Sequence, residues 1–135
     1  MNLKHGDITD LILRAFFEIY GELGYGFLEK VYENCMVIAC RKLGLKMSPQ
    51  YSVKVHFQNQ IVGEHQIDIL VNDLVIVELK AVRTLLEEHE AQLLNYLKAT
   101  PFEVGLLLNF GPKPEYRRKI LDNDRKGNLS WYKVS

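Results

Sequence analysis

Three charged residues lie inside one apolar stretch, and they constrain the fold more than any other feature of the chain. The stretch covers residues 67–80 and reads Ile-Asp-Ile-Leu-Val-Asn-Asp-Leu-Val-Ile-Val-Glu-Leu-Lys, so that Asp68 stands ten positions before Glu78 and Lys80 two after it. Two aliphatic runs flank a central Asn-Asp turn signal, which predicts a β-hairpin whose strands are buried on both faces. Charges inside such strands are expensive unless something binds them. A divalent cation is the simplest partner for two buried carboxylates.

The pairing of this hairpin decides whether the two carboxylates meet, because side chains alternate between the faces of a sheet. If the Asn-Asp pair alone forms the loop, Asp68 lies opposite Val77. A three-residue loop or a bulge instead places Asp68 opposite Glu78, on the face that carries Lys80, and a metal site requires this arrangement. Oxygen ligands on strands suit Mg²⁺ or Mn²⁺, and the lysine can hold a phosphate or a water beside the metal. The alternative is a buried ion pair of Lys80 with one carboxylate, which leaves the other unneutralised.

The rest of the chain predicts a single domain over residues 1–135, with no linker and no repeat. Helical spacing of apolar residues predicts helices from Asp7 to about Gly21 or Gly24, over about residues 27–43, and over residues 85–99. Strands are expected over residues 51–57, 61–71, 74–80, 103–110 and 116–121, the last at a sheet edge. The first three strands should be consecutive and antiparallel. This order of elements indicates an α/β fold of the α+β type.

The second predicted helix has two candidate faces. We expect it to bury an apolar stripe and to end with Gly44 as its C′ residue. The apolar stripe consists of Leu28, Val31, Cys35, Ile38 and Ala39, and the adjacent stripe of Glu29, Tyr32, Glu33, Met36 and Cys40. If the helix packs across the sheet, Glu29, with Glu33 in reserve, can supply a further metal ligand that Tyr32 fixes by hydrogen bonding. A solvent-exposed face is the alternative for these polar residues.

The third predicted helix carries a polar stripe beside its leucines. His89, Gln92 and Tyr96 are separated by three and four residues and therefore share one side of a helix. The Gln92 amide can orient a base or a phosphate oxygen, and the Tyr96 hydroxyl can donate to phosphate. Each residue taken singly is more typical of an ordinary boundary position than of a functional one.

Charge and histidine content narrow the classes of partner. Seventeen basic and seventeen acidic residues cancel, so any contact with nucleic acid must be local. A basic cluster near the C-terminus, which includes Lys113, Arg117 and Arg118, is either solvated surface or a track for the phosphate backbone. No nucleophile elbow, phosphate-binding glycine loop or zinc spacing is present, and His56 and His65, like His5, are interpreted as incidental.

The cysteines and the N-terminus indicate the compartment. Cys35 and Cys40 are five apart in a predicted helix, which gives neither metal-ligand nor redox spacing and fits a reducing, cytoplasmic compartment. Arg14 and Glu18 interrupt the first apolar run, so we expect neither a signal peptide nor a membrane span.

The order of these motifs resembles the PD-(D/E)XK nuclease superfamily, in its RecB-like branch with a Q-x-x-x-Y motif. The resemblance is closer to the small GxxExxY protein family, whose pattern stands here as Gly26, Glu29 and Tyr32, and it extends to the Asn-Phe-Gly at residues 109–111. The proline that usually precedes the first aspartate is absent, Gln66-Ile67 standing in its place, and no ligand is lost. The resemblance implies a restriction-endonuclease-like core, with a mixed central sheet of four to five strands flanked by helices.

The resemblance also implies roles for single residues. Asp68, Glu78 and the backbone carbonyl of Leu79 would bind Mg²⁺ or Mn²⁺, the helical glutamate would complete the shell, and Lys80 would orient or deprotonate the nucleophilic water. Gln92 and Tyr96, with Tyr32 and His89 beside them, would position the nucleic-acid strand.

Three functions follow as competing hypotheses. The first is a metal-dependent deoxyribonuclease with DNA as its partner. The second is a catalytically silent nuclease-fold module that binds nucleic acid or protein. The third is an interaction subunit whose exposed hydrophobic residues form a homodimer surface.

Overall fold

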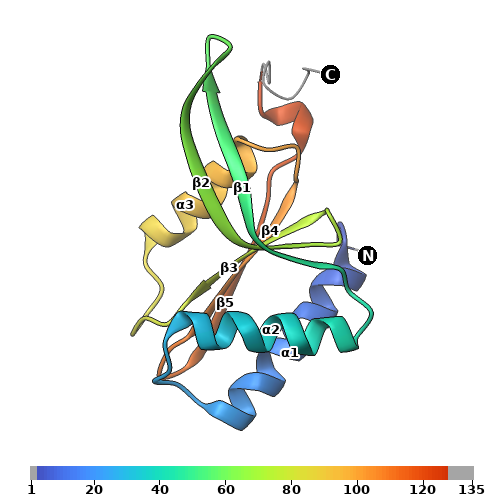
Figure 1. The fold of residues 1–135 in the computed structure, drawn as a ribbon, viewed down its shortest axis with the longest axis vertical. Coiled ribbons are helices and arrows are strands. Elements are labelled where there is room, and N and C mark those ends of the chain that lie inside the picture. Colours follow the sequence, from blue (N-terminus) through green and yellow to red (C-terminus); the bar gives the residue numbers. More distant parts are fainter. Residues whose placement is uncertain (1–2, 128–135) are drawn as a thin grey trace.

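Five strands form one mixed sheet, in the order β1-β2-β3-β4-β5, with helices on both faces (Figure 1). The computed structural model describes residues 3–127, so the outermost residues of the predicted domain lie outside the described range. The elements are α1 (Gly6–Leu23), α2 (Glu29–Lys42), β1 (Met47–Phe57), β2 (Gln60–Val71), β3 (Val75–Lys80), α3 (Glu87–Lys98), β4 (Val104–Phe110), β5 (Pro114–Ile120) and a 3₁₀ turn, η1 (Asn123–Arg125). The predicted fold class and element order are confirmed.

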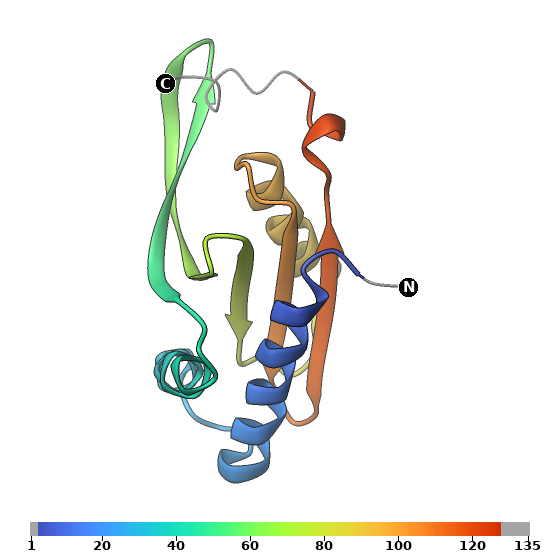
Figure 2. The same cartoon turned by 90° about the vertical axis from the view of Figure 1, so that its right-hand side faces the viewer.

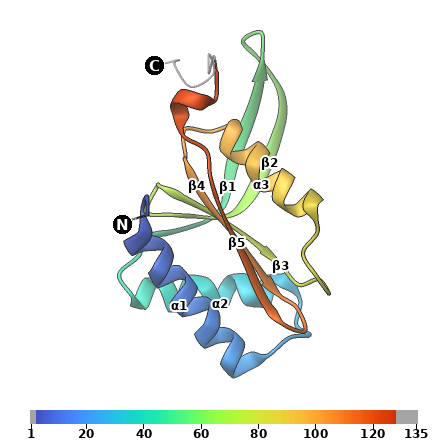
Figure 3. The same cartoon turned by 180° about the vertical axis from the view of Figure 1, so that it is seen from behind.

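The sheet topology follows from the connections. β1, β2 and β3 are antiparallel neighbours joined by short turns, as predicted, whereas β3 and β4 are parallel. Parallel neighbours need a crossover connection, and α3 provides it. β5 pairs antiparallel with β4 and forms one edge of the sheet, opposite the β1 edge. α1 and α2 lie on one face and α3 on the other (Figures 2 and 3).

β3 lies at the centre of the core, and its side chains alternate between the two hydrophobic layers on either face of the sheet. Val75, Val77 and Leu79 belong to the cluster that packs under α1 and α2, and Ile76 belongs to the cluster under α3. Side chains two apart share a face of a strand. Glu78 and Lys80 are therefore directed toward the α3 side.

The face that α2 buries differs from the prediction. Tyr32, Met36 and Cys40 are buried together with Glu33, while Leu28 and Ile38 of the expected core stripe are exposed. The Tyr32 ring stacks on Phe110 of β4, with centroids 4.1 Å apart. The polar stripe thus faces the sheet. Gly44, with a φ of 85°, is the residue that follows the helix C-cap, as predicted.

The β1–β2 hairpin is the longest pairing and projects beyond the rest of the sheet (Figure 1). Its turn residues Gln58 and Asn59 both have positive φ, the conformation of a type I′ turn, which matches the twist of the strands. In residues 3–127 no helix is both long and apolar enough to cross a membrane.

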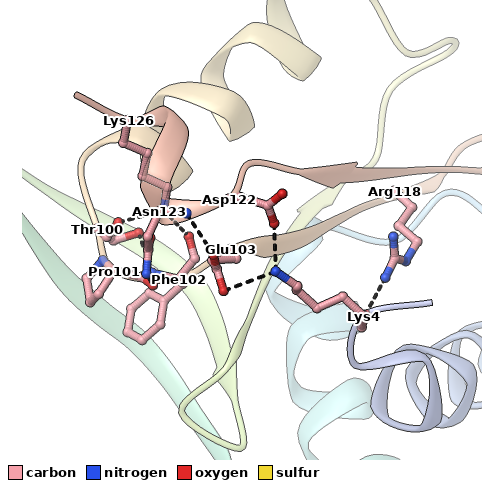
Figure 4. A network of polar contacts seen from close by, with 9 residues as sticks. All are labelled: Lys4, Thr100, Pro101, Phe102, Glu103, Arg118, Asp122, Asn123 and Lys126. Atoms are coloured by element: carbon pink, nitrogen blue, oxygen red, sulfur yellow. Dashed lines mark hydrogen bonds and ion pairs between the residues drawn. The ribbon is translucent and has the colours of Figure 1, made fainter. Parts of the chain in front are cut away.

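A polar network fastens both ends of the described chain to the start of β4 (Figure 4). Lys4 Nζ lies 2.6 Å from Asp122 and 3.4 Å from Glu103, and Arg118 donates to the Lys4 carbonyl. The buried Lys126 ammonium donates to two backbone carbonyls, those of Thr100 at 2.9 Å and Phe102 at 2.6 Å. These basic residues therefore have structural partners.

Candidate metal centre

The central hairpin adopts the pairing that brings the carboxylates together. Val71 pairs with Val75, which leaves a three-residue loop, and the pairing continues as far as Ile69 opposite Val77. One step further in this register, Asp68 stands opposite Glu78. The second of the two predicted arrangements is confirmed.

The two strands separate at this step, and carboxylates replace the backbone ladder. Glu78 Oε1 accepts the Asp68 N–H at 3.0 Å, and Asp68 Oδ2 accepts the Leu79 N–H at 2.7 Å. The two carboxyl groups also contact each other through their side chains. The Leu79 carbonyl points to the same side of β3 as the Leu79 N–H, because both backbone groups of a strand residue face the same neighbour. The two carboxyl groups and the Leu79 carbonyl thus all lie at the opening between β2 and β3.

Strand β2 changes its facing at Asp68. Ile67 packs in the cluster under α3, whereas Ile69 packs under α1 and α2, although regular alternation would put both on one face. Gln50, the residue opposite Asp68 in the β1 register, has a φ of 53°. This local distortion gives Asp68 access to groups from both helical layers.

The surroundings of Asp68 and Glu78 disfavour the ionised form of both carboxyl groups. Burial, followed by the charge of Asp68, raises the pKa of Glu78 to about 8, and Glu78 is only 6% exposed. Burial also raises the pKa of Asp68, against the effect of the Leu79 N–H. The Lys80 charge lowers both pKa values without cancelling the rise, and in residues 3–127 no group is hydrogen-bonded or ion-paired to its ammonium. A cation bound here would favour the ionised form of both groups and lower their pKa values.

Glu33 on α2 is the closer of the two helical glutamates in electrostatic effect. It is 4% exposed, and its charge raises the pKa of Asp68 more than the charge of Glu29, which is exposed at the first turn. Gln50 Nε2 donates to Glu33 Oε1 at 2.6 Å, and Lys30 Nζ to Oε2 at 2.7 Å. Sequence reasoning missed Gln50, since nothing in its neighbourhood predicts a positive φ. Within residues 3–127, no three acidic, histidine or cysteine side chains are close enough together to hold a metal ion.

The three polar residues of α3 fall into two groups. Tyr96 and Gln92 lie on the side of the candidate metal centre, and His89 lies at the helix start. Burial and the charges of Glu78 and Asp68 raise the pKa of Tyr96, so its hydroxyl lies within electrostatic reach of the pair. Gln92 is exposed, and with Tyr96 it lines a pocket of about 820 Å³ between α3 and the β1–β2 hairpin. His89 Nδ1 accepts the Leu86 N–H at 3.0 Å and so satisfies a free donor at the helix start.

His56 and His65, which the sequence left without a role, also line this pocket. The His65 ring lies 5.9 Å from that of Tyr96. We refer to the pocket as the α3 groove.

The Tyr32 hydroxyl binds backbone groups of the segment before α2 and does not bind a glutamate. It donates to the Gly24 carbonyl at 2.7 Å and accepts the Phe27 N–H at 3.3 Å. Since the hydroxyl has a single proton, the predicted hydrogen bond from Tyr32 to a helical glutamate is wrong. The residue is part of the fold next to the centre.

Most of the basic cluster forms internal contacts. Lys119 lies 2.5 Å and Arg117 3.7 Å from Glu90 of α3, and Arg118 donates to the N-terminal segment. Lys113 is exposed in the turn before β5. Arg117 and Arg118 therefore link β5 to its neighbours, and the structure leaves Lys113 as the exposed member of the three candidates.

Comparison with known proteins gives a match to a protein family and similarity to solved structures. A protein family model described as the PD-(D/E)XK nuclease superfamily matches residues 6–119. The crystal structure of SSO0001 is similar to this chain with a TM-score of 0.53 and 17% sequence identity, covering 92% of this chain and 72% of that one. At this identity the likeness concerns the fold alone. A search of curated proteins gives no match.

Proposed function

The chain belongs to the PD-(D/E)XK nuclease superfamily, and from this premise we propose that it is a metal-dependent nuclease that hydrolyses the phosphodiester bonds of DNA. Within the superfamily we assign it to the GxxExxY family, on the pattern of Gly26, Glu29 and Tyr32. One observation carries the proposal. Asp68 and Glu78 are held side by side in the opening between two strands, where burial raises both pKa values and the charge of Asp68 raises that of Glu78 further.

The donor set fits a hard divalent cation. Mg²⁺ is commonly bound by one or two carboxylates, with waters and substrate phosphate filling the remaining positions, so a third acidic side chain is not required. Asp68, Glu78 and the Leu79 carbonyl would hold Mg²⁺ or Mn²⁺. Such an ion lowers the pKa of a bound water and stabilises charge on the phosphate.

The remaining residues act around this centre. The Lys80 ammonium, directed to the same face as Glu78 and without a protein partner in residues 3–127, would orient the attacking water or the phosphate. Tyr96 and Gln92 would position the strand in the α3 groove through hydroxyl and amide hydrogen bonds. Glu33, with both oxygens bound to Lys30 and Gln50, would contribute negative charge and water-mediated contacts rather than a direct metal bond.

Cleavage of labelled single-stranded and duplex DNA, with Mg²⁺, Mn²⁺ or EDTA, tests the proposal. We expect metal-dependent cleavage by the wild type and a loss of about 10²–10⁴-fold in Lys80→Ala, the usual effect of a positioned proton-transfer group. Asp68→Ala should lose at least as much. Lys42→Ala, which removes an exposed lysine at the end of α2, should retain full activity. Absence of metal-dependent cleavage by folded protein on both substrates would refute the proposal.

A silent binding module is the second candidate, favoured by the absence of a three-residue metal cluster in residues 3–127. Under this alternative, Glu78→Gln would bind DNA as tightly as the wild type, and neither protein would cleave it. A nuclease instead requires Glu78 for turnover.

A further inference from the structure

A second pocket, of about 610 Å³, lies between the start of α2 and the end of β3. Three chain segments line it: residues 25–29 before and at the start of α2, residues 81–83 directly after β3, and residues 110–112 at the β4–β5 turn. Figures 1 and 3 show these three connections meeting at one end of the sheet. We call this pocket the aromatic hollow.

Large apolar side chains of the aromatic hollow face solvent. Tyr25 is 60% exposed, Phe27 48% and Leu28 80%. Contiguous exposed apolar surface of this kind usually marks a binding site. None of the three is needed to fill the core beneath, because the Tyr32–Phe110 stack already does so.

The segment that presents these side chains is fixed in place. The Tyr32 hydroxyl bridges the Gly24 carbonyl and the Phe27 N–H, and the Phe27 ring packs edge-on against Tyr32, with centroids 6.1 Å apart. On the opposite wall, Tyr20 donates to the Gly111 carbonyl at 2.7 Å. A rigid aromatic surface loses little conformational entropy when a ligand stacks on it.

Two elements connect the aromatic hollow to the candidate metal centre. Ala81, which lines the hollow, directly follows Lys80 at the end of β3, and Glu29, which also lines it, stands one helical turn before Glu33 on α2. Arg83, which also lines it, follows Lys80 by three residues, is exposed, and has no hydrogen bond or ion pair within residues 3–127. A nucleic-acid strand whose phosphate lies at the carboxylates would therefore meet aromatic rings and a free guanidinium on this side.

We propose that the aromatic hollow binds an unpaired nucleobase of the strand at the metal centre, and that the substrate is single-stranded DNA. The inference rests on the proposed nuclease function and specifies its substrate class. Phe27 and Tyr25 offer faces on which a base stacks, and Arg83 binds an adjacent phosphate. The volume lies within the range of pockets that enclose small ligands. A base inside a duplex has both faces covered by its neighbours and cannot enter.

Binding measurements test the inference separately from cleavage. Fluorescence anisotropy with a fluorescein-labelled single strand and the corresponding duplex, in Ca²⁺ to suppress hydrolysis, should give tighter binding of the single strand. Phe27→Ala should weaken single-strand binding roughly 5- to 100-fold, the loss expected for one base–aromatic stack. Phe27→Tyr should bind as the wild type does, whereas Phe27→Leu, which keeps apolar surface without an aromatic face, should resemble Phe27→Ala.

Two further variants complete the experiment. Tyr25→Ala changes a side chain that is mostly in solvent and should fold normally while weakening single-strand binding. Ile38→Ala, which truncates a similarly exposed residue (59%) of α2 outside the hollow, should leave binding unchanged. Equal affinity for single strand and duplex, or full single-strand affinity in folded Phe27→Ala and Tyr25→Ala, would overturn the inference. Stacking-dependent binding without any metal-dependent cleavage would instead refute the nuclease activity and leave the nucleobase site standing.

Discussion

Replacing Glu78 by glutamine should stabilise the metal-free protein, by an amount that grows as the pH rises. Burial and the charge of Asp68 raise the pKa of Glu78 from 4.5 to about 8. Between these values the folded chain keeps a proton that the unfolded chain releases, so stability is lost as the pH rises toward the folded-state pKa. Glutamine has the same shape, cannot ionise, and retains an oxygen to accept the Asp68 N–H.

The size of the effect follows from the two pKa values. Each pH unit over which only the folded state holds the proton costs about 1.4 kcal/mol. Integrated from pH 5 to pH 8, with pKa values of 4.5 and about 8, the free energy of unfolding falls by about 3–4 kcal/mol in the wild type relative to Glu78→Gln.

Urea unfolding followed by circular dichroism, in EDTA and at several pH values between 5 and 8, measures this difference. Glu22→Gln, which removes one exposed carboxylate of α1, controls for the change in net charge and should show a difference from the wild type that stays constant with pH. If the difference in unfolding free energy between Glu78→Gln and the wild type also stays constant from pH 5 to pH 8, the pKa of Glu78 is not raised in the folded protein. The electrostatic reasoning then fails.

Substitutions at three positions test other parts of the structure. Lys126→Ala should lower the free energy of unfolding by about 1–3 kcal/mol, because two carbonyls lose their buried donor, and Lys126→Met, which keeps the packing, should cost a similar amount in urea unfolding. Wild-type stability in both would contradict the role of the ammonium. Tyr32→Phe should cost about 1 kcal/mol through loss of the bond to Gly24 and should speed proteolysis before α2, whereas an unchanged digestion rate would count against that anchor. Gly111→Ala would place a Cβ 2.2 Å from the Val82 carbonyl oxygen and should cost about 1–3 kcal/mol in thermal unfolding, with no change expected only if the turn shifts freely.

The central hairpin was predictable from the sequence because local and long-range signals agree there. Asn72 and Asp73 tolerate positive φ, which both adopt, and the flanking aliphatic runs indicate strands buried on both sides. Loop length was not determined by these residues alone. Burying the Asp68 and Glu78 charges separately would cost free energy, and this cost favoured the three-residue loop, which brings them together. The structure has that loop.

The buried face of α2 was not predictable from hydropathy. The helix has two adjacent stripes that both contain apolar residues. The stripe with Leu28 and Ile38 is the more apolar, yet the stripe with Tyr32 and Glu33 is buried. The reversal depends on partners distant in sequence. Phe110 stacks on Tyr32, and a β1 glutamine in an unusual backbone conformation binds Glu33.

The basic cluster shows the same limitation. Its spacing indicates a positive surface, but Glu90 of α3, which pairs with Arg117 and Lys119, approaches them only when the sheet is assembled. Sequence patterns identify residues that require a partner more readily than they identify the partner. Asp68 and Glu78 could be selected for this reason, and the contacts of Arg117 could not.

Anomalous diffraction from crystals soaked in Mn²⁺ tests most directly whether Asp68 and Glu78 hold a divalent cation. We predict a peak between β2 and β3, about 2.1 Å from one oxygen of each carboxylate and from the Leu79 carbonyl, and its disappearance in Asp68→Asn. A crystal that binds Mn²⁺ elsewhere on the protein but shows no peak between these two carboxylates would contradict the prediction.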